Sequence, residues 1–155
     1  MKNFLFLTAF LLLAFVQMNL AQDFKSDADL RKDTEASLQG NWRTTRAVRD
    51  GQEVRIEGQF VASEIEFSGG KFITRAGGKE FFGSYTFDPK QNPMWITLEY
   101  DRNTGQPWQG TTLRGVFKVE GNKLTIVTNV QKRPTELSSQ KNSLNFLMEF
   151  ERGKN

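Results

Sequence analysis

The stretch Leu38-Gln39-Gly40-Asn41-Trp42 lies at the boundary between two sequence patterns. Before it, Leu30, Ala36 and Leu38 form the narrow apolar stripe of a short helix that Ser26 caps. From Trp42 onward, apolar and polar residues alternate with a period of two. This period is typical of strands with one buried and one solvated face. The chain after Leu38 is therefore predicted to be all-β.

Eight strands are predicted in this part of the chain. They cover residues 41–48, 62–67, 71–75, 79–87, 94–100, 111–119, 123–129 and 143–151. Turn-forming pairs such as Asp50-Gly51, Gly69-Gly70 and Gly77-Gly78 separate them. Consecutive antiparallel strands with short links form a meander, and eight of them close into a barrel. We predict an eight-stranded antiparallel up-and-down barrel preceded by a short helix, with a two-sheet sandwich as the alternative.

The chain is predicted to hold one domain behind an export signal. Lys2, an apolar run over residues 4–16 and Ala21 fit a cleavable secretory signal. The run is shorter than the roughly 20 residues that a membrane-spanning helix needs, so we expect no membrane span in the mature form. The predicted division is residues 1–21 signal peptide, 22–37 short helix and linker, 38–152 barrel and 153–155 tail.

Composition narrows the classes of partner. The chain has no Cys, so an exported barrel of this size must be held by packing and hydrogen bonds alone. This suits a bacterial periplasm or the cell exterior. Of the 21 Lys and Arg, Lys2 leaves with the signal, and the remaining 20 face 18 Asp and Glu. The basic residues are scattered, so neither nucleic acid nor an anionic membrane surface is an expected partner.

The residue inventory argues against an enzyme. The chain has neither His nor Cys, which excludes Ser-His triads, thiol nucleophiles and the usual zinc sites. Asp101 and Glu136 are the carboxylates that could act in acid-base catalysis, but solvated loop charges are the simpler interpretation. No catalytic residue, cofactor or metal is predicted.

Loop lengths predict which end of the barrel is open. Connections of an up-and-down barrel alternate between its ends, and the links over residues 49–61, 101–110 and 130–142 are long and share one rim. Ligands of small barrels enter through such a mouth. The residues predicted to bind a ligand there are Phe60, Tyr100, Trp108, Arg133 and Glu136.

Each of these residues has a structural alternative. The Arg133-Pro134-Thr135-Glu136 segment is either a turn whose charged side chains cap nearby groups, or a lid on which Arg133 meets an anionic head group. Phe60, Tyr100 and Trp108 either close the rim as core residues or present an aromatic surface to an apolar ligand.

An ordered set of short segments resembles a known family. The segments are Leu38-Gln39-Gly40-Asn41-Trp42, Arg49-Asp50-Gly51-Gln52, Gly83-Ser84-Tyr85, Leu113-Arg114-Gly115-Val116-Phe117 and Arg133-Pro134-Thr135-Glu136. Together they resemble a family of secreted bacterial lipocalin-like domains of unknown function, within the lipocalin or calycin superfamily. The resemblance implies a fold and no established activity. In lipocalins the Gly-x-Trp tryptophan closes the barrel floor under an arginine of the last strand, which implies a structural floor of Gly40, Trp42 and Arg152.

Two function classes follow. The first is an exported, non-enzymatic barrel that binds a small hydrophobic or amphipathic ligand at its long-loop mouth, which superfamily analogy favours. The alternative is a filled barrel that binds a protein or cell-envelope partner. Inward Phe67, Phe117, Phe146 and Phe150 favour filling, whereas the small Gly83 and Gly115 favour a cavity.

Overall fold

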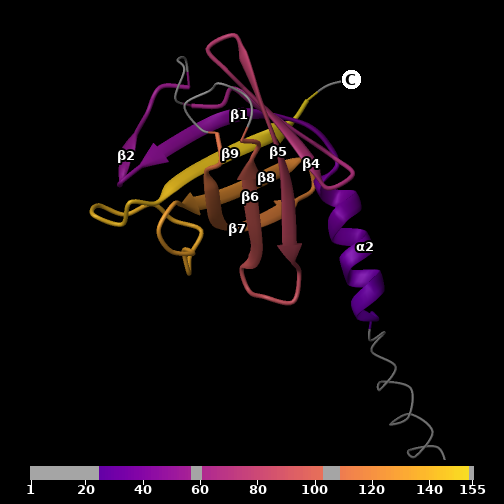
Figure 1. Cartoon of the computed structure of the whole chain (residues 1–155). Helices are drawn as coiled ribbons and strands as arrows, with labels where there is room; N and C mark the ends of the chain where they lie inside the picture. Colours follow the sequence, from indigo (N-terminus) through magenta and orange to yellow (C-terminus); the bar gives the residue numbers. More distant parts are fainter. Residues whose placement is uncertain (1–24, 57–60, 103–108, 154–155) are drawn as a thin grey trace, which may run out of the picture.

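The computed structural model describes residues 25–56, 61–102 and 109–153, which form one helix and nine strands (Figure 1). The predicted signal peptide lies outside the described residues, as do Phe60 and Trp108. The elements are α2 (Asp27–Leu38), β1 (Gly40–Arg49), β2 (Gln52–Glu53), β3 (Glu64–Ser68), β4 (Lys71–Ala76), β5 (Lys79–Asp88), β6 (Met94–Tyr100), β7 (Thr112–Glu120), β8 (Lys123–Asn129) and β9 (Phe146–Arg152). No helix in the described part of the chain is long and apolar enough to cross a membrane.

The strands close into the predicted barrel. Each strand from β3 to β8 pairs antiparallel with the next, and β1 pairs with β3 on one edge and with β9 on the other. Eight strands therefore form an antiparallel barrel without a free edge along most of its length. The helix α2 precedes the barrel, as predicted, and Ser26 is its N-cap, whose hydroxyl accepts a hydrogen bond from the Asp29 amide.

Two details at the rim differ from the sequence prediction. The first long link contains the short strand β2, which pairs with the end of β1 through a two-residue turn. Asp50 and Gly51 both have positive φ, 52° and 78°, as a type I′ hairpin turn requires. The last strand begins at Phe146 rather than at residue 143, because Leu144 adopts φ 55°, a left-handed conformation that no strand accommodates.

A bulge in β1 decides which side chains of this strand face inward. The β1–β9 register runs from Trp42 opposite Arg152 to Thr44 opposite Phe150 and then shifts between Thr44 and Arg46. The extra residue restarts the alternation, so Trp42 and Thr44 face inward below the bulge and Ala47 and Arg49 above it.

The end of the barrel next to α2 is filled with side chains. Trp42, Phe67, Phe117 and Phe150 are almost completely buried there, together with Leu38 of the helix. The interpretation that Gly83 leaves space for a ligand is wrong: a Cβ on Gly83 would lie 2.6 Å from the Phe72 ring and 2.3 Å from the Glu99 carbonyl oxygen. Glycine at this position lets a ring from the neighbouring strand cross the barrel interior. Gly115 leaves no space for a ligand either, because a Cβ there would lie 2.7 Å from the Val127 carbonyl oxygen and 3.0 Å from the Thr128 side chain.

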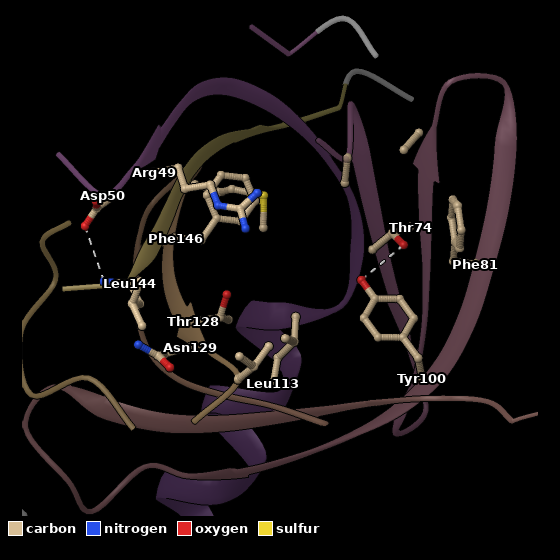
Figure 2. Close-up of a pocket in the computed structure, with 14 residues that line it drawn as sticks. Arg49, Asp50, Thr74, Phe81, Tyr100, Leu113, Thr128, Asn129, Leu144 and Phe146 are labelled. Carbon is tan, nitrogen blue, oxygen red and sulfur yellow. Dashed lines mark hydrogen bonds between the residues drawn. The ribbon is translucent and has the colours of Figure 1, made fainter. Parts of the chain in front are cut away.

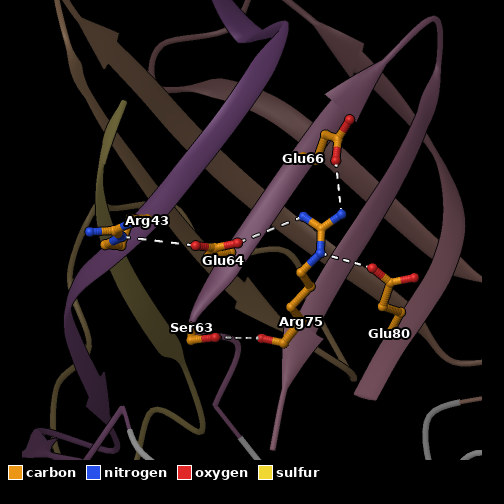
Figure 3. A network of polar contacts seen from close by, with 6 residues as sticks. All are labelled: Arg43, Ser63, Glu64, Glu66, Arg75 and Glu80. Atoms are coloured by element: carbon orange, nitrogen blue, oxygen red, sulfur yellow. Dashed lines mark hydrogen bonds and ion pairs between the residues drawn. The ribbon is translucent and has the colours of Figure 1, made fainter. Parts of the chain in front are cut away.

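The outer face of the barrel has two different surfaces. Across β3, β4 and β5 it carries an ion-pair ladder in which Arg75 contacts Glu66 at 3.1 Å and Glu80 at 2.9 Å, and Glu64 bridges Arg75 and Arg43 (Figure 3). Hydrogen bonds to Glu66 and Glu80 raise the pKa of Arg75. Such exposed cross-strand pairs contribute a few tenths of a kcal/mol each, so this face is simply solvated.

Across β7, β8, β9 and β1 the outer face carries a covered apolar patch. A second cluster of buried side chains lies outside the barrel wall, and Leu137 of the link between β8 and β9 packs against it. Its members are Val48, Val116, Val127 and Leu147. The long link is therefore folded against the barrel wall.

The Trp42 side chain supplies a large part of the packing at the filled end. Trp42→Ala should lower the free energy of unfolding by about 3–5 kcal/mol, because the indole is fully buried and its loss leaves a cavity. Urea denaturation followed by far-ultraviolet circular dichroism measures this. Phe82→Ala is the control, since Phe82 is an exposed aromatic residue of β5 and its truncation should change stability by only about 0.5 kcal/mol. Equal midpoints for Trp42→Ala and wild type would contradict the assignment.

Candidate functional site

The candidate site is a cavity of about 210 Å³ at the rim of the barrel opposite α2 (Figure 2). The ends of β1, β4, β6 and β8 and the starts of β5, β7 and β9 surround it. The sequence predicted an open mouth at this rim, and the cavity lies there. Its lining residues are Arg49, Asp50, Ala62, Thr74, Ala76, Phe81, Tyr100, Leu113, Thr128, Asn129, Val130, Leu144, Phe146 and Met148.

The walls of the cavity are mostly apolar. Apolar side chains come from Phe146 and Met148 of β9, Leu113 of β7, Phe81 of β5 and Ala76 of β4. The depth of the cavity is limited because the rings of the filled end occupy the remaining interior. The shape that results is a shallow apolar cup at the top of a packed core.

Hydroxyl groups interrupt the apolar walls. The Tyr100 hydroxyl lies 3.4 Å from the Thr74 hydroxyl, close enough for a hydrogen bond in which either group can donate. Burial raises the pKa of Tyr100, so its phenol stays protonated and remains a donor at neutral pH. Figure 2 shows the Thr128 hydroxyl directed into the same space.

Arg49 brings a positive charge to the mouth. It is the last residue of β1 and lies opposite Phe146 in the β1–β9 register. Figure 2 shows its guanidinium group directed over the cavity. The ion pairs formed within the described ranges use other arginines, and none includes Arg49. A cation therefore faces a largely apolar space.

The neighbouring Asp50 forms hydrogen bonds that shape the rim. Its carboxylate accepts a hydrogen bond from the Leu144 amide at 3.4 Å, and its own amide donates to the Asn145 carbonyl oxygen at 3.2 Å. These bonds attach the β1–β2 turn to the link before β9. They also hold Leu144 in its left-handed conformation, which leaves the leucine side chain 57% exposed at the lip of the cavity. Backbone strain of this kind occurs where surrounding contacts over-determine it, often beside binding sites.

The network around Asn129 fixes the same segment of the lip, residues 143–145, from the end of β8. The buried Asn129 amide group donates to the Ser143 carbonyl oxygen at 3.1 Å and to the Asn145 side chain at 3.0 Å. Its side-chain oxygen accepts from the amides of Gln131 and Lys132. The amide nitrogen and the oxygen of the Asn129 side chain are thus both used in hydrogen bonds within the rim. The polar groups that face the cavity are the hydroxyls of Thr74, Tyr100 and Thr128 and the guanidinium of Arg49.

Of the five residues predicted to bind a ligand, the structure places Tyr100 in the cavity wall. Phe60 and Trp108 lie outside the described residues. Arg133 and Glu136 do not line this cavity. Glu136 is exposed and accepts a hydrogen bond from the Ser138 hydroxyl at 3.1 Å. Asp101, the other carboxylate considered for catalysis, is also exposed and does not line the cavity.

Arg133 instead attaches the long link to the outer wall. Its guanidinium donates hydrogen bonds to the carbonyl oxygens of Ile96 and Gly115 and to the Thr97 hydroxyl at 2.9 Å. The same group lies 4.8 Å from the centre of the Trp95 ring. These contacts correspond to the turn interpretation, in which charged side chains of the segment cap nearby groups, and they hold the link against β6 and β7.

The residues predicted to form the floor, Gly40, Trp42 and Arg152, lie next to one another. The Arg152 guanidinium lies 4.2 Å above the Trp42 ring and donates to the carbonyl oxygens of Gln39 at 2.7 Å and Ser37 at 2.8 Å. The Trp42 indole donates to the Leu38 carbonyl oxygen at 2.8 Å. Gly40 has φ 103°, and a Cβ there would lie 3.4 Å from the Arg152 guanidinium. Floor and cavity therefore occupy opposite ends of the barrel.

Sequence reasoning missed Arg49. Counting alternate positions from Trp42 places residue 49 on the outer face, because the count passes through the bulge at residues 44–46. The Asp50-Gly51 turn was the local signal that residue 49 ends a strand at the rim. No group of three or more His, Cys, Asp or Glu that could hold a metal ion occurs within the described ranges.

Comparison with known proteins finds no match to a protein-family model, to a curated protein or to a solved structure. The chemistry of the site therefore rests on its own geometry.

Removal of the Arg133 side chain should loosen the long link. We expect Arg133→Ala to lower the free energy of unfolding by about 2–3 kcal/mol, because hydrogen bonds from a charged donor are lost and two carbonyl groups lose a partner. Thermal and urea denaturation measure this. Lys132→Ala, at an exposed neighbouring position, should leave stability unchanged. A fully stable Arg133→Ala that failed to bind ligand would instead favour the lid interpretation.

Proposed function

We propose that this chain is an exported, non-enzymatic barrel that binds a small ligand with an apolar body at its rim. The observation that carries the proposal is the cavity of about 210 Å³, whose walls are mostly apolar and whose mouth holds a few polar groups. Small-molecule sites in proteins have this composition: apolar walls fill the contact surface, and a few polar groups orient the ligand.

The volume limits the size of the ligand. Pockets for drug-sized ligands measure about 300–1,000 Å³, whereas an apolar cavity of about 150 Å³ holds one benzene molecule. A cavity of about 210 Å³ thus accommodates one ring with a short substituent or a short acyl chain. Longer molecules would have to leave part of their body outside the rim.

Export and the absence of catalysis are parts of the same proposal and rest on sequence. The positive start, apolar run and small Ala21 of residues 1–21 support export to a bacterial periplasm or beyond. The lack of His and Cys throughout the chain supports a binding role over an enzymatic one. The lipocalin-like resemblance supports the same class of function by analogy only.

Native mass spectrometry of the processed protein, made with its signal in a bacterial host, tests the proposal. We expect an excess mass that disappears on denaturation, or uptake of a small apolar dye by protein that was purified empty. Bare protein that takes up no dye and no short fatty acid would overturn it and favour the filled-barrel alternative with a macromolecular partner.

A cavity-filling variant makes this test specific. Ala62→Phe should abolish uptake, because Ala62 lines the cavity and an aromatic ring would occupy much of its volume. Ala36→Phe is the matched control, since Ala36 is an exposed residue of α2 and lies at a distance from the rim. Uptake that survives Ala62→Phe in a folded protein would place binding elsewhere on the molecule.

A further inference from the structure

We infer that the ligand is a small amphipathic monocarboxylate whose head group binds to Arg49 at the mouth and whose apolar body fills the cavity. This inference rests on the proposed binding function and adds the chemical class of the ligand. Three observations carry it: the direction in which Arg49 points, the lack of a carboxylate within 4.0 Å of its guanidinium among the described residues, and the volume of the apolar space beneath it.

The bulge in β1 turns Arg49 toward the barrel interior. Thr44 faces inward opposite Phe150, and after the register shift Ala47 faces inward opposite Met148 and Arg49 opposite Phe146. Without the extra residue, Val48 would face inward and Arg49 would face solvent. Bulges beside binding sites often redirect a side chain in this way. The guanidinium group is therefore held next to the Phe146 ring at the open end of the cavity (Figure 2).

Arg49 is electrostatically different from the other arginines of β1. Arg43 faces Glu64 at 3.9 Å, and Arg46 pairs with Glu53 at 2.7 Å and with Glu149 at 2.9 Å. Within the described residues no carboxylate lies within 4.0 Å of the Arg49 guanidinium. Among the described residues Asp50 is the one acidic residue in the lining, and its carboxylate already accepts a hydrogen bond from the Leu144 amide.

A carboxylate matches this arrangement. Guanidinium groups bind carboxylates through charge-assisted, often bidentate hydrogen bonds, and the single Arg49 supplies one positive charge for one negative charge. The Thr128 hydroxyl, directed into the same space, adds a neutral donor. An ammonium head group would meet the like charge of Arg49, and a neutral hydroxyl would leave the charge without a counter-ion.

The volume defines the length of the apolar body. At roughly 30 Å³ for each group of the size of a water molecule, about 210 Å³ holds about seven such groups. Leu113, Phe146 and Met148 would enclose them. Affinity should rise about fourfold per methylene, equivalent to ~0.8 kcal/mol, up to octanoate. Longer fatty acids should gain little more, because the added methylenes remain outside the cavity.

Isothermal titration of the processed protein with octanoate, 1-octanol and octylamine tests the inference. The three compounds have the same tail and differ in head-group charge. We expect octanoate to bind at least tenfold more tightly than 1-octanol, and octylamine to bind most weakly. Binding of 1-octanol as tight as that of octanoate would overturn the inference and leave the proposed function intact. Absence of binding by all three would overturn both.

Arg49→Gln identifies the residue responsible. This variant should lower the affinity for octanoate at least tenfold and leave that for 1-octanol unchanged, and Arg49→Lys should retain part of the preference. Arg114→Gln is the matched control, because Arg114 is exposed on β7, does not line the cavity and carries the same charge. Circular dichroism and melting temperature confirm that each variant is folded. Unchanged octanoate binding by a folded Arg49→Gln would overturn the assignment of the head group to Arg49.

Discussion

The pairing of β1 with β9 is the contact on which the rest of the structure depends. It closes the barrel. Because its register shifts between Thr44 and Arg46, the two halves of β1 direct different sets of alternate residues into the interior. Below the bulge, Trp42 enters the core and meets Arg152 of the last strand. Above the bulge, Ala47 and Arg49 face the interior. One additional residue thus separates a strand segment that builds the floor from a segment that builds the mouth.

Filling one end of the barrel leaves the other end available for binding. The buried rings next to α2 supply apolar burial at about 25 cal/mol per Å², which is the main stabilising contribution in a domain without disulfides. Residues at the rim stabilise the fold less: Leu144 has a strained backbone and an exposed side chain, and Arg49 has no counter-charge among the described residues. Such features are costly for stability and are typical of places where a ligand supplies the missing contacts.

The link between β8 and β9 shows how a polar segment can be structural. Arg133 binds carbonyl groups of β6 and β7, and Leu137 covers the apolar outer cluster. The wall behind the cavity is therefore two layers thick on this side, whereas the outer face of the opposite wall is exposed and carries ion pairs such as that of Arg75. This asymmetry holds β7, β8 and β9 in place behind the cavity residues Leu113, Thr128 and Phe146.

Local chemistry made most of the fold predictable from the sequence. Period-two alternation located the barrel strands, Asp-Gly and Gly-Gly pairs located the turns, and Ser26 located the start of the helix, because each of these preferences acts over a few neighbouring residues. The long links also indicated which rim holds the cavity.

Only the tertiary structure decided which side chains enter the cavity. Arg49 faces inward because of a bulge against β9, and the space above Gly83 is filled by Phe72 of a neighbouring strand. Register and packing join residues that are distant in the chain, and no local preference encodes them.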